Sequence, residues 1–270
     1  MMKRIEGFRL LCLVTAASVA TQAHAQASAP APEQADSQNG GVTEIIVTAQ
    51  RKAERQLEVP ISLSAVTAQT LERTGVASVT TLGRLVPSFQ YEDSLASSGA
   101  RARVLGLGSP TFVSGVETSV SVVIDGVVTG PSGSGLSDLF DVERVEVLRG
   151  PQGTLFGKNA NAGVVNITSA RPTETLTAGI TTRLAKADYG PVDNAWSTRV
   201  DGYVSGPISD TTQVRIAGFT NYDFKGVVEE RFRGGENYRR RHYGGRLSLH
   251  HESGPWEVDL TGSYIRINDA

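Results

Sequence analysis

The chain has 270 residues, of which 39% are hydrophobic and 20% charged, and its formal net charge at pH 7 is −2. A charge this close to zero gives no support to a general nucleic-acid-binding or acidic-substrate role. The 29 glycines favour turn-rich β structure over a helical bundle. The single cysteine, Cys12, lies in the leader described next, so no disulfide or thiol chemistry is expected after it.

Residues 1–25 are predicted to be a secretory signal peptide. A basic start precedes an apolar run over residues 10–20, and Ala23-His24-Ala25 has the small-x-small pattern of a cleavage site. Leu11 stands where a lipoprotein leader needs a small residue, which disfavours lipidation of Cys12. Residues 26–43 are rich in Ala, Ser, Gln and Pro and are predicted to be a disordered tether.

A β-prone segment over residues 44–50 follows the tether and precedes Arg51 and Lys52. One interpretation is the first strand of the following domain. The other is an exposed strand that pairs through its backbone with the edge of a partner's sheet, where alternate side chains set the register. Both stay open on the residues alone.

A strand and two short helices are predicted after this segment. A strand is expected over residues 60–66, and then a helix that begins at the cap Thr67 and is closed by Gly75. Ser78 is expected to cap a second helix, which Pro87 ends.

The later part of this domain is predicted to be strands and turns. Residues 102–107 are a strand candidate, and Asp125-Gly126 between two apolar arms predicts a tight hairpin over residues 120–128. A charged strand over residues 142–148 leads through a glycine-punctuated turn into a second strand over residues 163–168.

The sequences of these segments resemble the plug domain of TonB-dependent outer-membrane receptors. The resemblance rests on Glu-Arg-Val-Glu-Val-Leu-Arg-Gly-Pro-Gln-Gly-Thr-Leu-Phe-Gly at residues 143–157, on Asn166-Ile167, and on the Val-Ile-Asp-Gly-Val hairpin. It implies an α+β plug domain over residues 51–170. It also implies that residues 44–50 are a TonB box, which pairs with the periplasmic C-terminal domain of TonB. The box residues are Glu44, Ile45, Ile46, Val47, Thr48 and Ala49.

The resemblance also suggests where other contacts lie. Ligand contact in this family comes from apical loops, which here correspond to Tyr91, Glu92, Asp93 and Phe112. A cluster of interleaved charges is expected to rest against the barrel wall as an ion-paired surface, in preference to acid/base catalysis. The cluster consists of Asp138, Asp141, Glu143 and Glu146 with the interleaved Arg144 and Arg149, and the wall contact is assigned to Glu143, Arg144, Glu146 and Arg149.

Residues 171–270 are predicted to be the N-terminal part of a transmembrane β-barrel. Apolar and polar residues alternate, and short turns alternate with longer polar connections over 187–194 and 225–241. The five expected strands cover 175–186, 195–206, 211–224, 242–251 and 256–266. The family barrel has about 22 strands, and open strand edges in lipid are costly. We therefore expect the chain to be a fragment.

The residues disfavour nucleotide binding and a metal site made by the two adjacent histidines. Gln152 and Asn159 break the phosphate-loop spacing around Gly157-Lys158, so nucleotide binding is disfavoured. Adjacent His250 and His251 would point to opposite faces of a strand and cannot jointly bind one metal. No cofactor or metal is expected, and the protein is not expected to be an enzyme.

The expected function is import of a scarce ligand, with a ferric siderophore as the first candidate, through TonB-driven rearrangement of the plug of a monomeric receptor. The basic connection over residues 225–241 is expected to face anionic lipopolysaccharide or to form part of an anionic-ligand vestibule. The alternatives are a passive or non-energised outer-membrane binding protein and an inactive truncated gene product.

Overall fold

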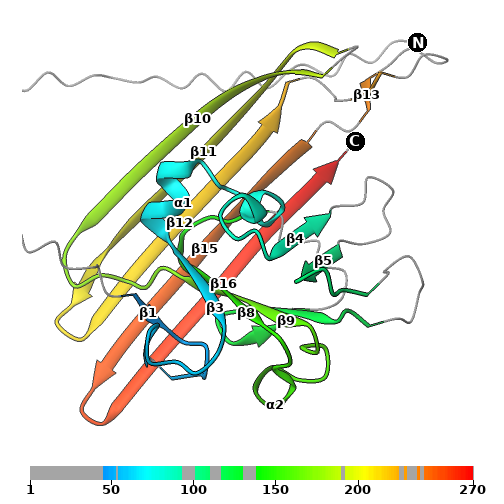
Figure 1. Ribbon diagram of the computed structural model, residues 1–270. Coiled ribbons are helices and arrows are strands. Elements are labelled where there is room, and N and C mark those ends of the chain that lie inside the picture. Colours follow the sequence, from blue (N-terminus) through cyan, green and yellow to red (C-terminus); the bar gives the residue numbers. More distant parts are fainter. Residues whose placement is uncertain are drawn as a thin grey trace, which may run out of the picture. The chain divides into compact units, whose positions relative to one another are not determined.

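The computed structural model describes residues 45–52, 54–92, 101–109, 117–129, 138–189, 192–224, 228–229, 236–237 and 240–269. These residues form an N-terminal domain of short elements (residues 45–170) and a sheet of five long strands, called here the long sheet (Figure 1). No helix among them is long and apolar enough to cross a membrane. The expected signal peptide and tether lie outside the described residues.

A five-stranded sheet in the order β3-β8-β9-β6-β7 forms the centre of the N-terminal domain. β6 and β9 are parallel, and the other neighbours are antiparallel. The neighbouring strands β8 and β9 are buried on both faces over most of their length, although both contain polar residues such as Glu146 and Asn166. The strands are β3 (Leu63–Thr67), β6 (Val120–Ile124), β7 (Val127–Val128), β8 (Val142–Arg149) and β9 (Gly163–Ser169).

Two apolar clusters cover the two faces of this sheet. One contains Val145 and Val147 of β8 and the side chains of α1 (Ala68–Thr74) and the 3-10 helix η1 (Val79–Arg84). The other contains Leu148 of β8, Phe156 of α2 (Gly153–Phe156), and the segment before β2. Because neighbouring residues of a strand point to opposite faces, β8 contributes to both clusters.

Several local predictions are confirmed. Thr67 caps α1, since its hydroxyl accepts a hydrogen bond from the Thr70 backbone N–H at 3.4 Å, and Gly75 closes the helix with φ +69°. The 120–128 hairpin is present. Asp125 and Gly126 have φ of 49° and 81°, the positive values that its two-residue turn requires.

Two local predictions are corrected. The Ser78 hydroxyl bonds the hydroxyls of Thr80 and Thr81 and caps no backbone group, and the helix that follows is a 3-10 helix. The strand expected over residues 102–107 is shorter: β5 (Arg101–Val104) pairs with β4 (Phe89–Glu92). It ends at Val104 because the next two residues turn with positive φ.

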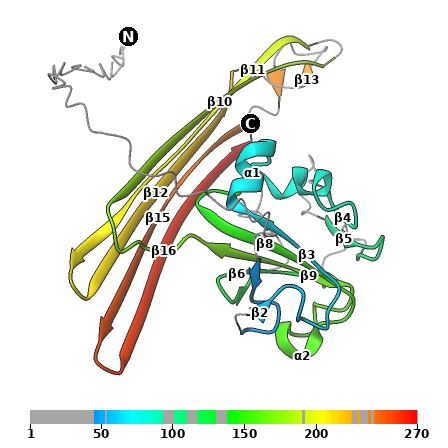
Figure 2. The same cartoon turned by 60° about the vertical axis from the view of Figure 1, so that its left-hand side comes forward.

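The long sheet confirms all five expected strands. Its strands are antiparallel neighbours in chain order: β10 (Thr177–Tyr189), β11 (Val192–Ser209), β12 (Thr212–Asp223), β15 (Arg240–Ser253) and β16 (Trp256–Asp269) (Figure 2). The longer connection expected over 187–194 is wrong, because β10 and β11 continue until Tyr189 pairs with Val192. Within 225–241, β13 (Val228–Glu229) pairs with β14 (Glu236–Asn237).

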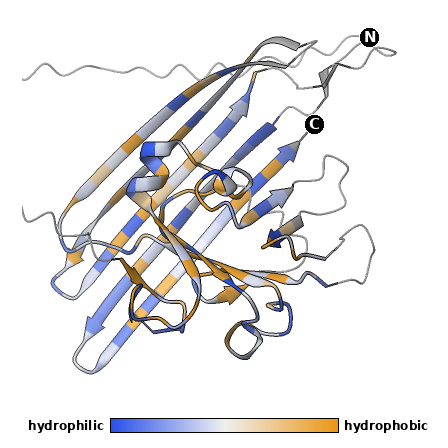
Figure 3. Ribbon diagram, viewed as in Figure 1, coloured by the Kyte–Doolittle hydropathy of each residue, from blue (hydrophilic) through white to orange (hydrophobic). Residues whose placement is uncertain are grey.

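Apolar and polar side chains lie on opposite faces of the long sheet. Figure 3 shows apolar and polar residues alternating along the long strands. Ile216 of β12 is 59% exposed, whereas its neighbour Ala217 is 5% exposed. The exposed face of the long sheet carries large apolar side chains, and the other face carries buried polar ones. This is the pattern of a strand whose apolar side faces lipid.

Candidate functional site

The face of the central sheet that carries Glu146 is covered by the segment 45–49. Glu146 and Asn166 are directly paired across β8 and β9, and both are buried. Asn166 Nδ2 donates to Glu146 Oε2 at 3.1 Å, and Arg144 Nε donates to Glu146 Oε1 at 2.8 Å. A carboxylate that is fully removed from water is thus hydrogen-bonded and charge-paired, as its burial requires.

Thr48 completes this polar network from the other side. Its backbone N–H donates to Glu146 Oε1 at 2.7 Å, and its hydroxyl accepts from Arg144 at 3.1 Å and from Asn166 at 3.3 Å. The segment is therefore bound to the sheet through the charged Glu146–Arg144 pair. Hydrogen bonds to charged groups are the stronger ones in proteins.

Apolar contacts flank the Thr48 contact. Val47 is 0% exposed and Ala49 is 1% exposed, and both pack with Leu148, Phe156 and Val164. The backbone makes only a short ladder, in which β1 (Ile46–Val47) pairs with β2 (Glu54–Arg55). The segment therefore lies within the N-terminal domain in this conformation, and its alternate side chains face the core.

This placement matches the first of the two sequence-based interpretations in one respect: the segment is a strand of the domain that follows it. Pairing with a partner's sheet is not tested by it. The Val47 and Ala49 side chains cannot face a partner strand while they are buried here. Glu44 lies outside the described residues.

A second polar contact joins the N-terminal domain to the long sheet. Residues 138–141 run along β11, β12 and β15, and each of these strands contributes an arginine to them. Arg199 donates to Asp138 Oδ1 at 2.6 Å and to the Leu139 carbonyl at 2.9 Å. Arg215 binds the Asp141 carboxylate through Nε and a terminal nitrogen.

The same four residues are held by further groups of the long sheet. Arg246 donates to the Asp141 carbonyl at 3.2 Å and lies over the ring of Phe140, 4.7 Å from its centroid. His242 Nδ1 shares a hydrogen bond with Asp138 Oδ2. Phe140 also stacks against Phe219, with 4.6 Å between centroids. The contact therefore combines ion pairs, carbonyl hydrogen bonds and aromatic packing.

Asp138 stays ionised in this contact. Burial raises the pKa of its carboxyl. The hydrogen bond and charge of His242, the charge of Arg199 and the hydrogen bond from Asn221 together outweigh this effect. The pKa therefore lies below the ordinary value of 3.8. The carboxylate form is thus the one that the surrounding groups stabilise.

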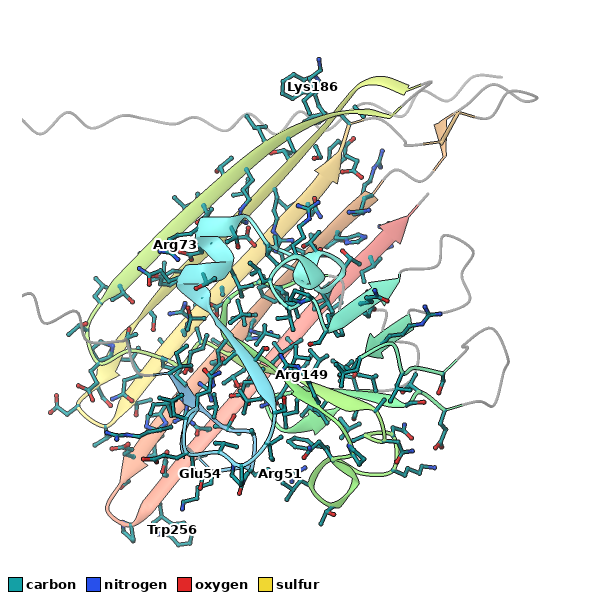
Figure 4. All side chains as sticks on the ribbon, in the orientation of Figure 1. Arg51, Glu54, Arg73, Arg149, Lys186 and Trp256 are labelled. Carbon is teal, nitrogen blue, oxygen red and sulfur yellow. The ribbon has the colours of Figure 1, made fainter. Side chains whose placement is uncertain are left out.

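The four charged residues expected at the barrel wall have their described partners within the N-terminal domain. Arg144 bonds Glu143 and Glu146, and Arg149 donates to the hydroxyls of Ser62, Ser64 and Ser88 (Figure 4). Asp138 and Asp141, two other members of the predicted charge cluster, contact the long sheet. Contact of the other four with a barrel wall stays a prediction.

Of the four expected apical residues, the structure describes Tyr91 and the backbone of Glu92. Tyr91 lies in β4 and packs against the first apolar cluster. Glu92 ends that strand, and nothing is described of its side chain. Asp93 and Phe112 lie outside the described residues, as does most of the basic connection over 225–241.

Comparison with known proteins agrees with the fold. Residues 55–164 match the protein family described as TonB-dependent Receptor Plug Domain. The pesticin receptor of Yersinia pestis is 31% identical over 147 residues, which are 54% of this chain and 21% of that protein. The vitamin B12 transporter BtuB of Vibrio vulnificus is 31% identical over 128 residues, 46% of this chain and 20% of that protein.

A solved structure is similar over more of the chain. The ferric yersiniabactin uptake receptor FyuA from Yersinia pestis superimposes with a TM-score of 0.62 at 25% identity, covering 76% of this chain and 31% of that structure. The chain thus spans about a fifth of the curated relatives and about a third of this structure. The expected α+β domain followed by part of an antiparallel barrel is confirmed.

Proposed function

Since the chain belongs to the TonB-dependent receptors of the Gram-negative outer membrane, we propose that it is the N-terminal part of a receptor that imports a scarce ligand by TonB-driven rearrangement of its plug domain. The N-terminal domain is this plug domain. The relatives are named receptors and transporters, and none of those named above is an enzyme. The long sheet supplies the first strands of the barrel, whose apolar face contacts bilayer lipid and lipopolysaccharide.

The observation that carries the proposal is the short backbone ladder by which residues 45–49 are attached to the plug domain. The segment has β-prone residues and only a two-residue ladder to β2, so a partner strand can replace that ladder. Leaving the plug domain exposes Val47, at about 1.5–3 kcal/mol. It also breaks the Thr48 hydrogen bond to Glu146, at about 1.5–3 kcal/mol. Pairing with TonB must offset several kcal/mol.

These energies suggest an order of events. A ligand at the outer face weakens the attachment of the segment, and the released Glu44–Ala49 backbone pairs with the periplasmic domain of TonB. Force transmitted through that pairing then displaces part of the plug domain. The box, the plug domain and the strand order of the barrel all support this sequence of steps.

A ferric siderophore is the proposed cargo. The support is the name of the similar solved structure, a ferric yersiniabactin uptake receptor. Another relative is named a vitamin B12 transporter, so cobalamin is the second cargo to test. Tyr91, Glu92, Asp93 and Phe112 are proposed as ligand contacts at the apex of the plug domain. The receptor is proposed to act as a monomer.

The test is capture of the periplasmic TonB domain by the full-length receptor in detergent. Replacing Val47 by Pro removes a backbone donor from the proposed strand and should abolish capture. The matched control is Leu57→Pro, at a position that is 94% exposed and outside the segment. This control should retain capture. Capture that survives Val47→Pro would show the proposed pairing to be wrong.

A non-energised binding protein is the second candidate. The burial of Val47 and Ala49 favours it, because the segment is then simply part of the plug domain's core. Deleting residues 44–50 in the full-length receptor distinguishes the two. Uptake should stop in a TonB-driven receptor and continue unchanged in a passive one.

A further inference from the structure

Four side chains of types that can bind metals lie on β15 and β16 near the short turn that joins these strands. Trp256, the first residue of β16 after this turn, is labelled in Figure 4. Glu252 is paired with Glu257 across the two strands, and His250 is paired with Asp259. Residues two apart on a strand point to the same side, so the four side chains share one face of the hairpin. It is the face on which Arg246 and Ser248 are buried.

The charges of this group are poorly balanced. Three carboxylates lie on the two paired strands, and Glu252 stands directly opposite Glu257, an arrangement that destabilises a sheet. Within the described part of the chain, His250 is the basic residue that bonds these carboxylates, and it contacts Glu252 and Asp259. A cation bound between these carboxylates would remove their repulsion.

The histidine is oriented as a metal ligand would be. Its Nδ1 is 2.6 Å from Asp259 Oδ1 and can donate to this carboxylate, and a metal ion at Nε2 would take the place of the proton there. Nε2 is 3.0 Å from Glu252 Oε1. Metal-bound histidines usually make such a bond to a carboxylate through their other nitrogen, which fixes the tautomer and the ring.

The distances are close to those of a three-ligand set. The ligand atoms of His250, Glu252 and Glu257 all lie within 4.8 Å of one another. Both glutamates are exposed, so small side-chain rotations can bring their oxygens closer. One imidazole and two carboxylates leave a coordination position for water, as in open zinc sites.

We propose that His250, Glu252 and Glu257 bind a divalent first-row transition metal ion of the Zn²⁺ type, with Asp259 holding the histidine in position. The imidazole favours such an ion over Ca²⁺ or Mg²⁺, which prefer oxygen ligands alone. The bound ion joins the ends of β15 and β16. The site is separate from the Thr48 and Asp138 contacts, and its existence does not depend on TonB or on the cargo.

The sequence did not indicate this site. His250 and His251 are adjacent and point to opposite faces, so the two histidines do not act together. The second strand supplies the missing ligand, because the turn brings Glu257 opposite Glu252. The register of the hairpin, and not the spacing along the chain, assembles the group.

Titration of the full-length receptor with Zn²⁺ tests the proposal. The protein is purified in detergent without a histidine tag, stripped with a chelator and followed by calorimetry. Wild type should bind one equivalent of Zn²⁺ that His250→Ala and Glu257→Gln lose. Asp259→Asn should weaken that binding by about 10–100-fold, because it removes the carboxylate that orients the histidine.

His251→Ala is the matched control. His251 is bonded to Thr212 at 2.8 Å and should be irrelevant to binding. His250→Gln serves if His250→Ala does not fold. X-ray absorption should find a single imidazole among the Zn²⁺ ligands. The proposal is overturned if wild type and the His250 variants titrate alike, if two or more imidazoles are found, or if equal Ca²⁺ displaces the Zn²⁺.

Discussion

The plug domain and the long sheet distribute the same kinds of side chain in opposite ways. In the plug domain, the large apolar residues of β8 and β9 are buried, and Glu146 is buried only with its partners. In the long sheet, Ile216, Leu247 and Leu260 are more than half exposed, while Arg199, Arg215 and Arg246 are buried. One chain therefore has two regions with reversed polarity.

The reversal is explained by what surrounds each region. The plug domain buries apolar surface away from water, which is the usual driving force of folding. The exposed face of the long sheet meets lipid in the outer membrane, where apolar side chains are favoured outside and polar side chains inside. Polar groups join the two regions, because Arg199 and Arg215 on the inner face of the sheet bind the carboxylates of Asp138 and Asp141.

The largest expected effect comes from an apolar truncation in the plug domain. Phe89 is 0% exposed and belongs to the first apolar cluster. Phe89→Ala should lower the free energy of opening of β8 and β9 by about 3–5 kcal/mol, because it leaves a cavity. Hydrogen exchange of the full-length receptor measures this. Leu57→Ala, at an exposed position, should change it by less than about 0.5 kcal/mol.

An arginine on the outer face of the long sheet tests the other half of the comparison. Ile216 lies near the middle of β12. Ile216→Arg should cost about 2–4 kcal/mol in unfolding from lipid vesicles, since it places a charge near the bilayer midplane. Ile208→Arg, close to a short turn, should cost only about 0–1 kcal/mol. Equal costs at the two positions would contradict the assignment of this face to lipid.

The sequence predicted the elements whose signals are local. The alternation of β12 and β16, the Asp125-Gly126 turn and the Thr67 cap are all readable within about ten residues, and all are present. Most errors lie at the ends of elements, and one concerns the type of the helix after Ser78. The 187–194 connection is polar, yet residues 187–189 and 192–194 belong to β10 and β11, because lumen-facing residues of such strands are polar too.

The contacts between distant segments could not be predicted in this way. Thr48 meets Glu146 across 98 residues, and Asp138 meets His242 across 104. The charge cluster predicted from the sequence includes Asp138 and Asp141, which make the contact with the long sheet, but the prediction assigns the contact to other members such as Glu143 and Arg149. Which carboxylate faces inward depends on the register and on the backbone just before β8, where Asp141 has a positive φ of 52°, and the residue types do not reveal these.

The contact at Asp138 tests whether charge holds the two regions together. Asp138→Asn keeps the shape of the side chain but removes the charge that faces Arg199 and His242. It should weaken the attachment of residues 138–141 by about 1.5–3 kcal/mol, the range for hydrogen bonds to charged groups. Hydrogen exchange at the start of β8 measures the change, and Asp210→Asn, in the exposed β11–β12 turn, should leave it unaltered.

The pH dependence of the same contact distinguishes charge from packing. Because the pKa of Asp138 in the folded protein is below its ordinary value of 3.8, its contribution is fully present above that value. It is lost as the pH falls through the lower, folded pKa. Wild type should therefore lose protection of residues 138–141 between about pH 5 and pH 2, whereas Asp138→Asn should lose less over the same range. Parallel losses would mean that Phe140 and its aromatic contacts hold the plug domain to the long sheet, and that the carboxylate contributes little.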